Sequence, residues 1–432
     1  MKDTINIGEA ISKGQGEVAL KGWCYRERGS NNLKFIVLRD SSNIIQCVVE
    51  KKSVSEEVWE AANKVHIETS MIIKGDIKED KRAPTGYEVF VKELKVVGEC
   101  LNYPIQKDQS KEFLADNRHL WLRSRRMTSI LKIRSTVFGA IHSYFRGKGF
   151  YEYQSPIFQP TQAEGGSDLF TVPYFGDTMY LAQTWQLQAE PAIFALENIY
   201  TIAPSFRAEK SVTSRHLTEY WHAEMEIAWN EFDDLQDHAE ALTKHIVKKV
   251  LEVNKEELKL LERDVKKLEP VVKKKFPRMT YDEVLEILKD KANMEIQWGK
   301  DLRTVEEDEL SKLYDTPVIV TRYPKEVKAF YMKEDPENSK VVLGFDLIGP
   351  EGYGELIGAS QREEDIEKLS INLKKMGEDP KNYEFYFDTR RYGSVPHGGF
   401  GMGVERIISW ICGLDTIKDT IPFPRTPERY KP

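Results

Sequence analysis

Short runs in which apolar and polar residues alternate fill the first hundred positions of the chain. Tyr87, Val89 and Val91 show this two-residue period, which is typical of a half-buried strand. The turn-forming segments RGSNN and SSN separate the earlier runs. Together these patterns predict five strands, at 18–26, 34–40, 44–50, 69–78 and 87–97.

A longer period, of three to four residues, predicts a short amphipathic helix at 54–65, after the third strand. Five strands with a helix in that place give the element order of an OB barrel, a common platform for single-stranded nucleic acid. For this segment alone, a β-barrel without a ligand stays open as the alternative. We predict an OB-fold domain at 1–100 and a hinge at 101–116, where Pro104 and the polar run QKDQSKE interrupt the pattern.

The pattern changes beyond the hinge. Apolar residues at helical spacing predict one long helix that ends at Gly147–Gly149, and they are Ile130, Ile133, Val137, Ile141 and Tyr144. Strands and glycine-rich turns follow, so 117–432 is predicted to be a second domain and the fold class to be α+β. Charged runs within 233–335 predict a mainly helical, solvated insertion, in which we find no chemistry.

Composition narrows the function less than the patterns do. The net charge of -7 does not favour a nucleic-acid binder, although a local basic patch can hide in such a total. No apolar run is long enough to span a membrane, and the N-terminus MKDTINIGEA does not resemble a signal peptide, so we expect a cytoplasmic protein. The four scattered cysteines have no zinc-site spacing and are expected to be buried thiols.

The segment SFRAEKSVTSRHLTEYWHAEMEIAW, at 205–229, predicts a hairpin of two strands joined by a polar loop. On its first strand, Phe206 and Ala208 are expected to face one side, and Arg207 and Glu209 the other. On its second strand, an apolar set alternates with a polar set: Trp221, Met225, Ile227 and Trp229 against Tyr220, His222, Glu224 and Glu226. A dense charged face behind a dense apolar one favours a ligand site over a surface ladder of salt bridges.

The segment VPHGGFGMGVERIISW, at 395–410, places four glycines before a helix. Glycine allows a ligand to approach the backbone closely, and Arg406 lies in the first turn of that helix. A glycine-rich turn before a helix is by itself only weak evidence for a ligand site. Its spacing fits neither a P-loop nor a dinucleotide-binding fingerprint.

Taken together, FRAE, RHLTE and GFGMGVER resemble motifs 2 and 3 of the class II aminoacyl-tRNA synthetases, and GFYEYQSP after the long helix resembles motif 1. With an N-terminal OB barrel, the order is similar to that of the aspartyl, asparaginyl and lysyl subgroup. The resemblance implies an antiparallel sheet flanked by helices, and a homodimer whose interface includes Pro156.

The resemblance also implies a site for ATP. Arg207 and Arg406 would be catalytic, Arg207 on the α-phosphate and Arg406 on adenine opposite the stacked Tyr220. Asp346 and Glu355 match a carboxylate pair that holds Mg²⁺ against the phosphates. The residues expected to bind ATP are Arg207, Glu209, His216, Leu217, Tyr220, Glu355, Gly403 and Arg406.

The resemblance also includes the positions that bind the amino acid substrate. Residues that match its binding positions are Glu164, Gln183, Gln186, Glu224 and Arg362. Aspartyl enzymes carry a lysine where this chain has Ala189, and an aspartate where it has Glu224. Loss of a cation and extension of an anion both favour L-asparagine, and therefore tRNA(Asn). An aspartyl enzyme, whether discriminating or non-discriminating, stays open as the alternative.

In the barrel, Phe35 and Gln46 match positions that stack on and hydrogen-bond the central anticodon base. Two other kinds of protein are also compatible with parts of the pattern. A stand-alone ATP-dependent amide ligase would keep the ATP motifs, but the barrel favours tRNA charging. A non-catalytic nucleic-acid-binding paralogue would lose Arg207, Glu209 or Arg406, and all three are present.

Overall fold

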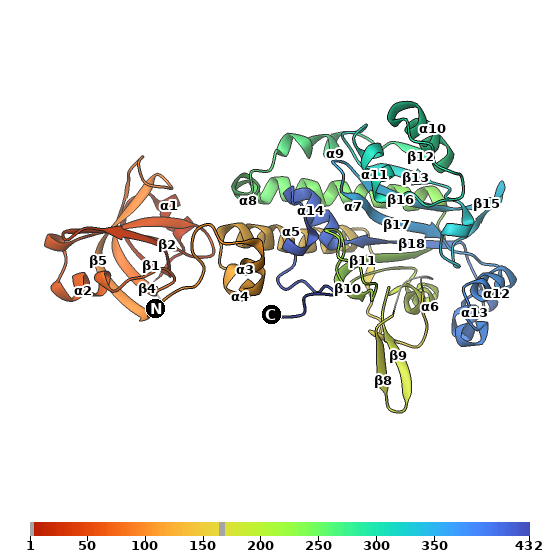
Figure 1. The fold of residues 1–432 in the computed structure, drawn as a ribbon, viewed down its shortest axis with the longest axis horizontal. Helices are drawn as coiled ribbons and strands as arrows, with labels where there is room; N and C mark the ends of the chain where they lie inside the picture. Colours follow the sequence, from red (N-terminus) through yellow and green to blue (C-terminus); the bar gives the residue numbers. More distant parts are fainter. Residues whose placement is uncertain (1–3, 164–168) are drawn as a thin grey trace. The chain divides into compact units, whose positions relative to one another are not determined.

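The computed structural model describes residues 4–163 and 169–432, and the chain divides into two compact units, 1–117 and 118–432 (Figure 1). Each unit has its own hydrophobic core. No helix among the described residues has both the length and the apolar surface needed to cross a membrane.

The first unit is a closed barrel with strand order β1-β2-β3-β5-β4. Its elements are α1 (Ile7–Lys13), β1 (Gly16–Gly29), β2 (Leu33–Arg39), β3 (Ile44–Glu50), α2 (Glu56–Asn63), β4 (Ser70–Glu79), β5 (Tyr87–Gly98) and α3 (Lys111–Asp116). The five predicted strands and the helix after the third are confirmed. Sequence analysis missed α1, although Asn6 and Glu9 form a capping box that fixes its start.

The second unit contains the remaining helices and strands. Its helices are α4 (Arg118–Trp121), α5 (Arg125–Gly147), α6 (Gln186–Leu196), α7 (Phe232–Val253), α8 (Lys255–Leu260), α9 (Glu269–Lys273), α10 (Tyr281–Ala292), α11 (Thr304–Ser311), α12 (Ile366–Lys375), α13 (Glu384–Arg391) and α14 (Val404–Cys412). The small strands are β7 (Phe158–Gln159), β8 (Thr171–Tyr174), β9 (Asp177–Leu181), β14 (Glu334–Asp335) and β15 (Asn338–Val342).

An eight-stranded sheet is the centre of this unit, in the order β12-β13-β16-β17-β18-β11-β10-β6. Its strands are β6 (Tyr151–Glu152), β10 (Asn198–Phe206), β11 (Glu219–Ala228), β12 (Arg278–Thr280), β13 (Val318–Thr321), β16 (Gly344–Gly349), β17 (Gly354–Gln361) and β18 (His397–Gly403). All neighbours are antiparallel except the outer pairs β12–β13 and β10–β6. The α+β class and the antiparallel sheet are therefore confirmed.

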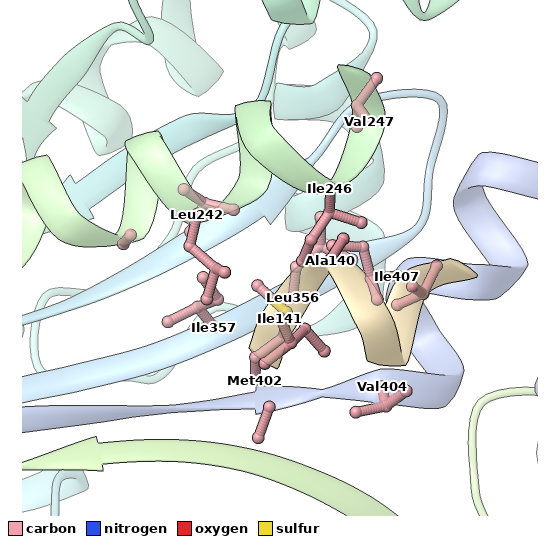
Figure 2. Close-up of a cluster of buried hydrophobic side chains, with 14 of the residues drawn as sticks. Ala140, Ile141, Leu242, Ile246, Val247, Leu356, Ile357, Met402, Val404 and Ile407 are labelled. Carbon is pink, nitrogen blue, oxygen red and sulfur yellow. The ribbon is translucent and has the colours of Figure 1, made fainter. Parts of the chain in front are cut away.

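Helices α5, α7 and α14 contribute to the main hydrophobic core, together with one face of this sheet. Figure 2 shows Ile141 of α5 and Leu242 of α7 among the side chains of β17 and β18. The predicted long helix is confirmed as α5. The expectation that 233–335 is solvated is wrong for α7, because one side of that helix is fully buried.

Two further expectations about 205–229 are corrected. Strand β10 ends at Phe206, so Arg207, Ala208 and Glu209 lie in the loop that follows and do not alternate across a strand. Strand β11 ends at Ala228, and Trp229 is 72% exposed instead of buried. The backbone of Trp229 has φ 57°, a left-handed conformation that turns the chain out of the sheet.

If α7 is part of the core, shortening its buried side chains must destabilise the protein. We expect Leu242→Ala and Ile246→Ala each to lower the free energy of unfolding by about 2 to 5 kcal/mol, because both side chains are fully buried. Val253→Ala, on the same helix at 64% exposure, should change it by less than about 0.5 kcal/mol. Urea unfolding of the three variants measures this, and equal values for all three would contradict the placement.

Candidate active site

The second face of the large sheet carries the charged residues. Because side chains alternate along β11, Met225 points into the core while Glu224 and Glu226 point to the opposite face. The strand register places Glu224 opposite Gly401 of β18, Gly401 opposite Gly358 of β17, and Gly358 opposite Asp346 of β16. Two carboxylates thus bound a row in which both intervening positions lack a side chain.

The glycines in this row are required by close neighbours. A Cβ at Gly401 would lie 2.4 Å from Nε2 of His222, and one at Gly358 would lie 2.8 Å from Oε1 of Glu355. Real Cβ atoms do not approach other atoms so closely, so alanine would displace these side chains. The glycine-rich run predicted to allow close approach does so here by keeping the floor of the site open.

A cavity of about 530 Å³ opens over this floor. Four of the predicted site residues line its polar parts: Gln186, Arg207, Glu224 and Arg362. The predicted carboxylate pair, Asp346 and Glu355, lies in its wall as well. The structure therefore brings three of the residues expected to bind the amino acid together with those expected to contact the α-phosphate and the metal.

A smaller cavity, of about 80 Å³, adjoins it and shares Arg207, His222, Glu355 and Gly401 with it. It contains five more of the predicted ATP-binding residues, namely His216, Leu217, Tyr220, Gly403 and Arg406. The Arg207 guanidinium lies 5.7 Å from the centre of the Tyr220 ring. Arg406 donates to the backbone oxygen of Glu355 at 2.7 Å, which fixes it beside the carboxylate pair.

Burial and neighbouring charges shift the pKa values of titratable groups in the site. Burial, together with the charges of Arg406 and Arg207, lowers the pKa of His216. Burial would raise the pKa of Glu355, but Arg406, Lys328 and Arg207 hold it below its usual value. Burial and the nearby Glu355 raise the pKa of Asp346 to about 6, against the attraction of Lys328.

Lys328 is a functional candidate that sequence analysis missed. Its Nζ donates to Oδ2 of Asp346 at 2.7 Å, and the residue lines the larger cavity. It lies within 233–335, the stretch in which sequence analysis found no chemistry. One lysine among many in a charged stretch gives no signal by spacing, and only the fold brings it to β16.

The donor set around Asp346 and Glu355 suits Mg²⁺ bound to a nucleotide. Oε1 of Glu355 and Oδ1 of Asp346 lie 2.8 and 3.8 Å from the point where Gly358 would carry a Cβ, so both oxygens face the same gap. The described residues contain no group of three or more His, Cys, Asp or Glu side chains that could hold a metal. Mg²⁺ needs no such cage, since one or two carboxylates and substrate phosphates are its usual ligands.

At the other end of the larger cavity, Glu224 accepts hydrogen bonds from the Thr184 hydroxyl and, at 3.0 Å, from the backbone N–H of Trp185. Arg362 pairs with Glu226 through Nε and Nη2, and donates to the Ser360 hydroxyl at 2.7 Å. Glu226 belongs to the charged face predicted for 205–229, but its pairing with Arg362 was not foreseen.

Two predicted residues lie elsewhere, and a third falls outside the described residues. Glu209 is in the loop after β10 and lines neither cavity. The side chain of Gln183 accepts a hydrogen bond from the backbone N–H of Ala163, next to the larger cavity instead of in its lining. Glu164 lies outside the described residues.

The barrel holds the two residues predicted to read the anticodon on neighbouring strands. Phe35 is on β2, and the Arg28 guanidinium lies 4.9 Å from the centre of its ring. Gln46 is on β3, where its Nε2 donates to Oε2 of Glu88 at 3.0 Å. A fixed amide and a cation beside an aromatic ring suit stacking and hydrogen bonding of a base.

Two family models match the chain. One describes an OB-fold nucleic acid binding domain and covers residues 18–97. The other describes tRNA synthetases class II (D, K and N) and covers residues 110–427. The chain therefore belongs to the class II tRNA synthetases of the D, K and N group.

The similar relatives narrow that class further. The asparagine--tRNA ligase of Thermococcus gammatolerans is 47% identical over 433 residues and that of Thermoplasma acidophilum 46% over 430, with at least 99% of this chain and all of each relative covered. A crystal structure of asparaginyl-tRNA synthetase from Pyrococcus horikoshii complexed with asparaginyl-adenylate matches over 100% of both chains, with 43% identity and a TM-score of 0.96.

Glu307 of α11 gives a pH-dependent test of the site's electrostatics. Burial, Glu355 and Asp346 raise its pKa from 4.5 to about 8, against Arg406 and Arg215. The folded state therefore holds this proton more tightly than the unfolded state, and stability from it is complete below pH 4.5 and is lost as the pH rises to about 8. Glu307→Gln avoids that loss. Its urea midpoint should rise relative to wild type between pH 5 and pH 8.

Glu309→Gln, at a half-exposed glutamate of the same helix paired with Lys312, controls for the substitution itself. A Glu307→Gln midpoint that falls relative to wild type over this pH range would contradict the shift assigned to Glu307.

Proposed function

We propose that this chain ligates L-asparagine to tRNA(Asn) in an ATP-dependent reaction, with asparaginyl-adenylate as the intermediate. The observation that carries the proposal is the row of residues across β11, β18, β17 and β16. It joins Glu224, a candidate amino-acid-binding residue, to Asp346, a candidate Mg²⁺ ligand, within one cavity. The asparagine--tRNA ligase names of relatives matched over their full length agree with it.

The first step needs no nucleophilic side chain. The carboxylate of asparagine attacks the α-phosphorus of ATP in line, and pyrophosphate leaves. The protein's part is to hold the two substrates in that geometry and to stabilise the charge that develops on the phosphate oxygens. Arg207 would contact the α-phosphate. Arg406 and Tyr220 would enclose adenine, Glu209 would bind its amino group, and His216 would reach the outer phosphates.

Mg²⁺ would be held by Asp346 and Glu355 and would supply positive charge to the phosphates of ATP. Lys328, bonded to Oδ2 of Asp346, would orient that carboxylate so that its other oxygen faces Glu355. Leu217 and Gly403 lie in the wall of the smaller cavity, where they would shape the space for the base.

The amino-acid end of the site would recognise asparagine through its two polar ends. Gln186, Gln183 and Glu164 would bind the α-amino group. Arg362 would donate to the side-chain oxygen, and Glu224 would accept from the side-chain NH₂ group. The carboxamide and the carboxylate have nearly the same shape, so charge must separate asparagine from aspartate.

In the second step a ribose hydroxyl at the 3′ end of tRNA attacks the adenylate carbonyl and AMP leaves. Phe35 would stack on the central anticodon base and Gln46 would hydrogen-bond it. We further propose a homodimer, with α5 and the segment around Pro156 in the interface, and a cytoplasmic location, where charged tRNA is consumed by translation.

The two arginines give the most direct test of the proposed chemistry. Arg207→Ala and Arg406→Ala should each lower kcat of asparagine-dependent pyrophosphate exchange by a factor of about 100 to 1,000, because one preorganised charge in such a site contributes roughly 3 to 4 kcal/mol. Arg391→Ala removes an exposed arginine that pairs with Glu384 and Asp388 on α13, and should leave the rate unchanged. Near-normal exchange by either site variant, with a normal thermal melt, would refute its assignment.

The role assigned to the barrel can be tested by measuring activation of the amino acid and charging of tRNA separately. Phe35→Ala should raise the KM for tRNA by roughly tenfold, because stacking on a base contributes about 1 to 3 kcal/mol. Pyrophosphate exchange without tRNA should not change, and Phe35→Tyr should keep most of the tRNA affinity. An equal loss in exchange and in charging would show that Phe35 stabilises the barrel and does not read tRNA.

A further inference from the structure

One carboxylate lies beneath the amino-acid end of the cavity without lining it. Glu190, on α6, is completely buried. Its Oε2 pairs with Nη1 of Arg390 at 2.6 Å and lies 3.2 Å from Nε2 of His397. Its Oε1 accepts from the Tyr386 hydroxyl at 2.8 Å. Sequence analysis and the proposed mechanism leave this buried anion without a role.

The same carboxylate contacts two residues that do line the cavity. Oε1 of Glu190 accepts a hydrogen bond from Nε2 of Gln186 at 2.9 Å and lies 3.8 Å from Nε of Arg362. Arg362 and Gln186 are the two side chains proposed to bind the substrate's side-chain oxygen and amino group. Glu190 is thus linked to both ends of the amino acid without touching it.

Arg362 consequently lies between two anions. Glu226 holds its Nε and Nη2, Glu190 approaches its Nε, and the Tyr331 ring lies 5.1 Å from its guanidinium carbon. A third carboxylate, Glu224, faces the same cavity. Burial and the charges of Glu190 and Glu224 raise the pKa of Glu226 to about 7, against the attraction of Arg362.

We propose that Glu190 is a specificity-determining positioning residue. From beneath the cavity it orients Gln186 and, together with Glu226, keeps Arg362 paired with the protein's own carboxylates, so that the site accepts a neutral carboxamide in preference to a carboxylate. This inference rests on the proposed ligation of asparagine, and it adds a residue that acts through others to those that would touch the substrate.

The physical reason is the balance of charge around Arg362. Arg362 and Arg390 share the carboxylates of Glu190 and Glu226, so Arg362 can donate to an amide oxygen but offers little net attraction to a further anion. Replacing Glu190 with glutamine keeps its shape and one of its two acceptor oxygens, and makes the floor of the site more positive by one unit. At an effective dielectric near 20, one unit charge within about 10 Å changes the binding of a charged side chain by roughly tenfold.

The experiment measures kcat/KM for pyrophosphate exchange with asparagine and with aspartate, and takes their ratio. Glu190→Gln should lower the asparagine-to-aspartate ratio by about tenfold. Arg390→Gln removes the positive charge beside Glu190 and should raise the asparagine-to-aspartate ratio. The double variant Glu190→Gln/Arg390→Gln restores the net charge and should return the ratio to within about threefold of wild type.

A purely structural role for the pair would slow both substrates together and would leave the ratio unchanged. Asp335→Asn is the matched control, because Asp335 is also a buried carboxylate paired with an arginine, Arg322 at 2.7 Å, but lies outside the cavity lining. It should not change the ratio. Thermal melts of all variants establish that each one is folded.

A folded Glu190→Gln enzyme with an unaltered ratio would overturn the inference. If that variant does not fold, an Arg390→Gln ratio that stays the same or falls would do so. Failure of all three variants to fold, while Asp335→Asn folds, would assign the pair to stability alone. A wild-type enzyme that does not activate asparagine would instead refute the proposed function, so the two failures are distinguishable.

Discussion

The central constraint on this protein is that one sheet carries two incompatible faces. The residues of β11 alternate between a core that packs on α5 and α7 and a cavity lined by carboxylates and arginines, with only the thickness of a backbone between them. Glycines in β17 and β18 keep the polar face open, since a Cβ at Gly358 or Gly401 would meet Glu355 or His222. Buried charges persist there because each has a partner of opposite sign or a hydrogen bond.

Many elements of the fold could be predicted from the sequence, because they depend on the local spacing of apolar and polar residues. The barrel strands, α5 and the charged face of β11 follow from two- and three-to-four-residue repeats. The glycines before Arg406 marked a place where backbone and ligand come close. Family resemblance then grouped distant residues, and the structure places Arg207, Tyr220, Glu355 and Arg406 around one small cavity.

What could not be predicted depends on contacts between residues far apart in the chain. Lys328 reaches Asp346 only because β13 pairs with β16, and Arg390 reaches Glu190 only because α13 packs on α6. The error over α7 has a similar cause, since its many charged residues conceal a completely buried apolar side that follows α5 and the sheet. The charged residues of a helical segment indicate that one side of the helix is exposed, but they do not show whether its other side is buried.

We propose that charge at the end of the cavity near Glu224 and Arg362 selects a neutral side chain. The most direct measurement is mass spectrometry of the aminoacyl ester formed on tRNA(Asn) when the enzyme is offered equal concentrations of asparagine and aspartate with ATP. We expect nearly all of the ester to carry asparagine. An ester that is mainly aspartyl, or an even mixture of the two, would contradict it.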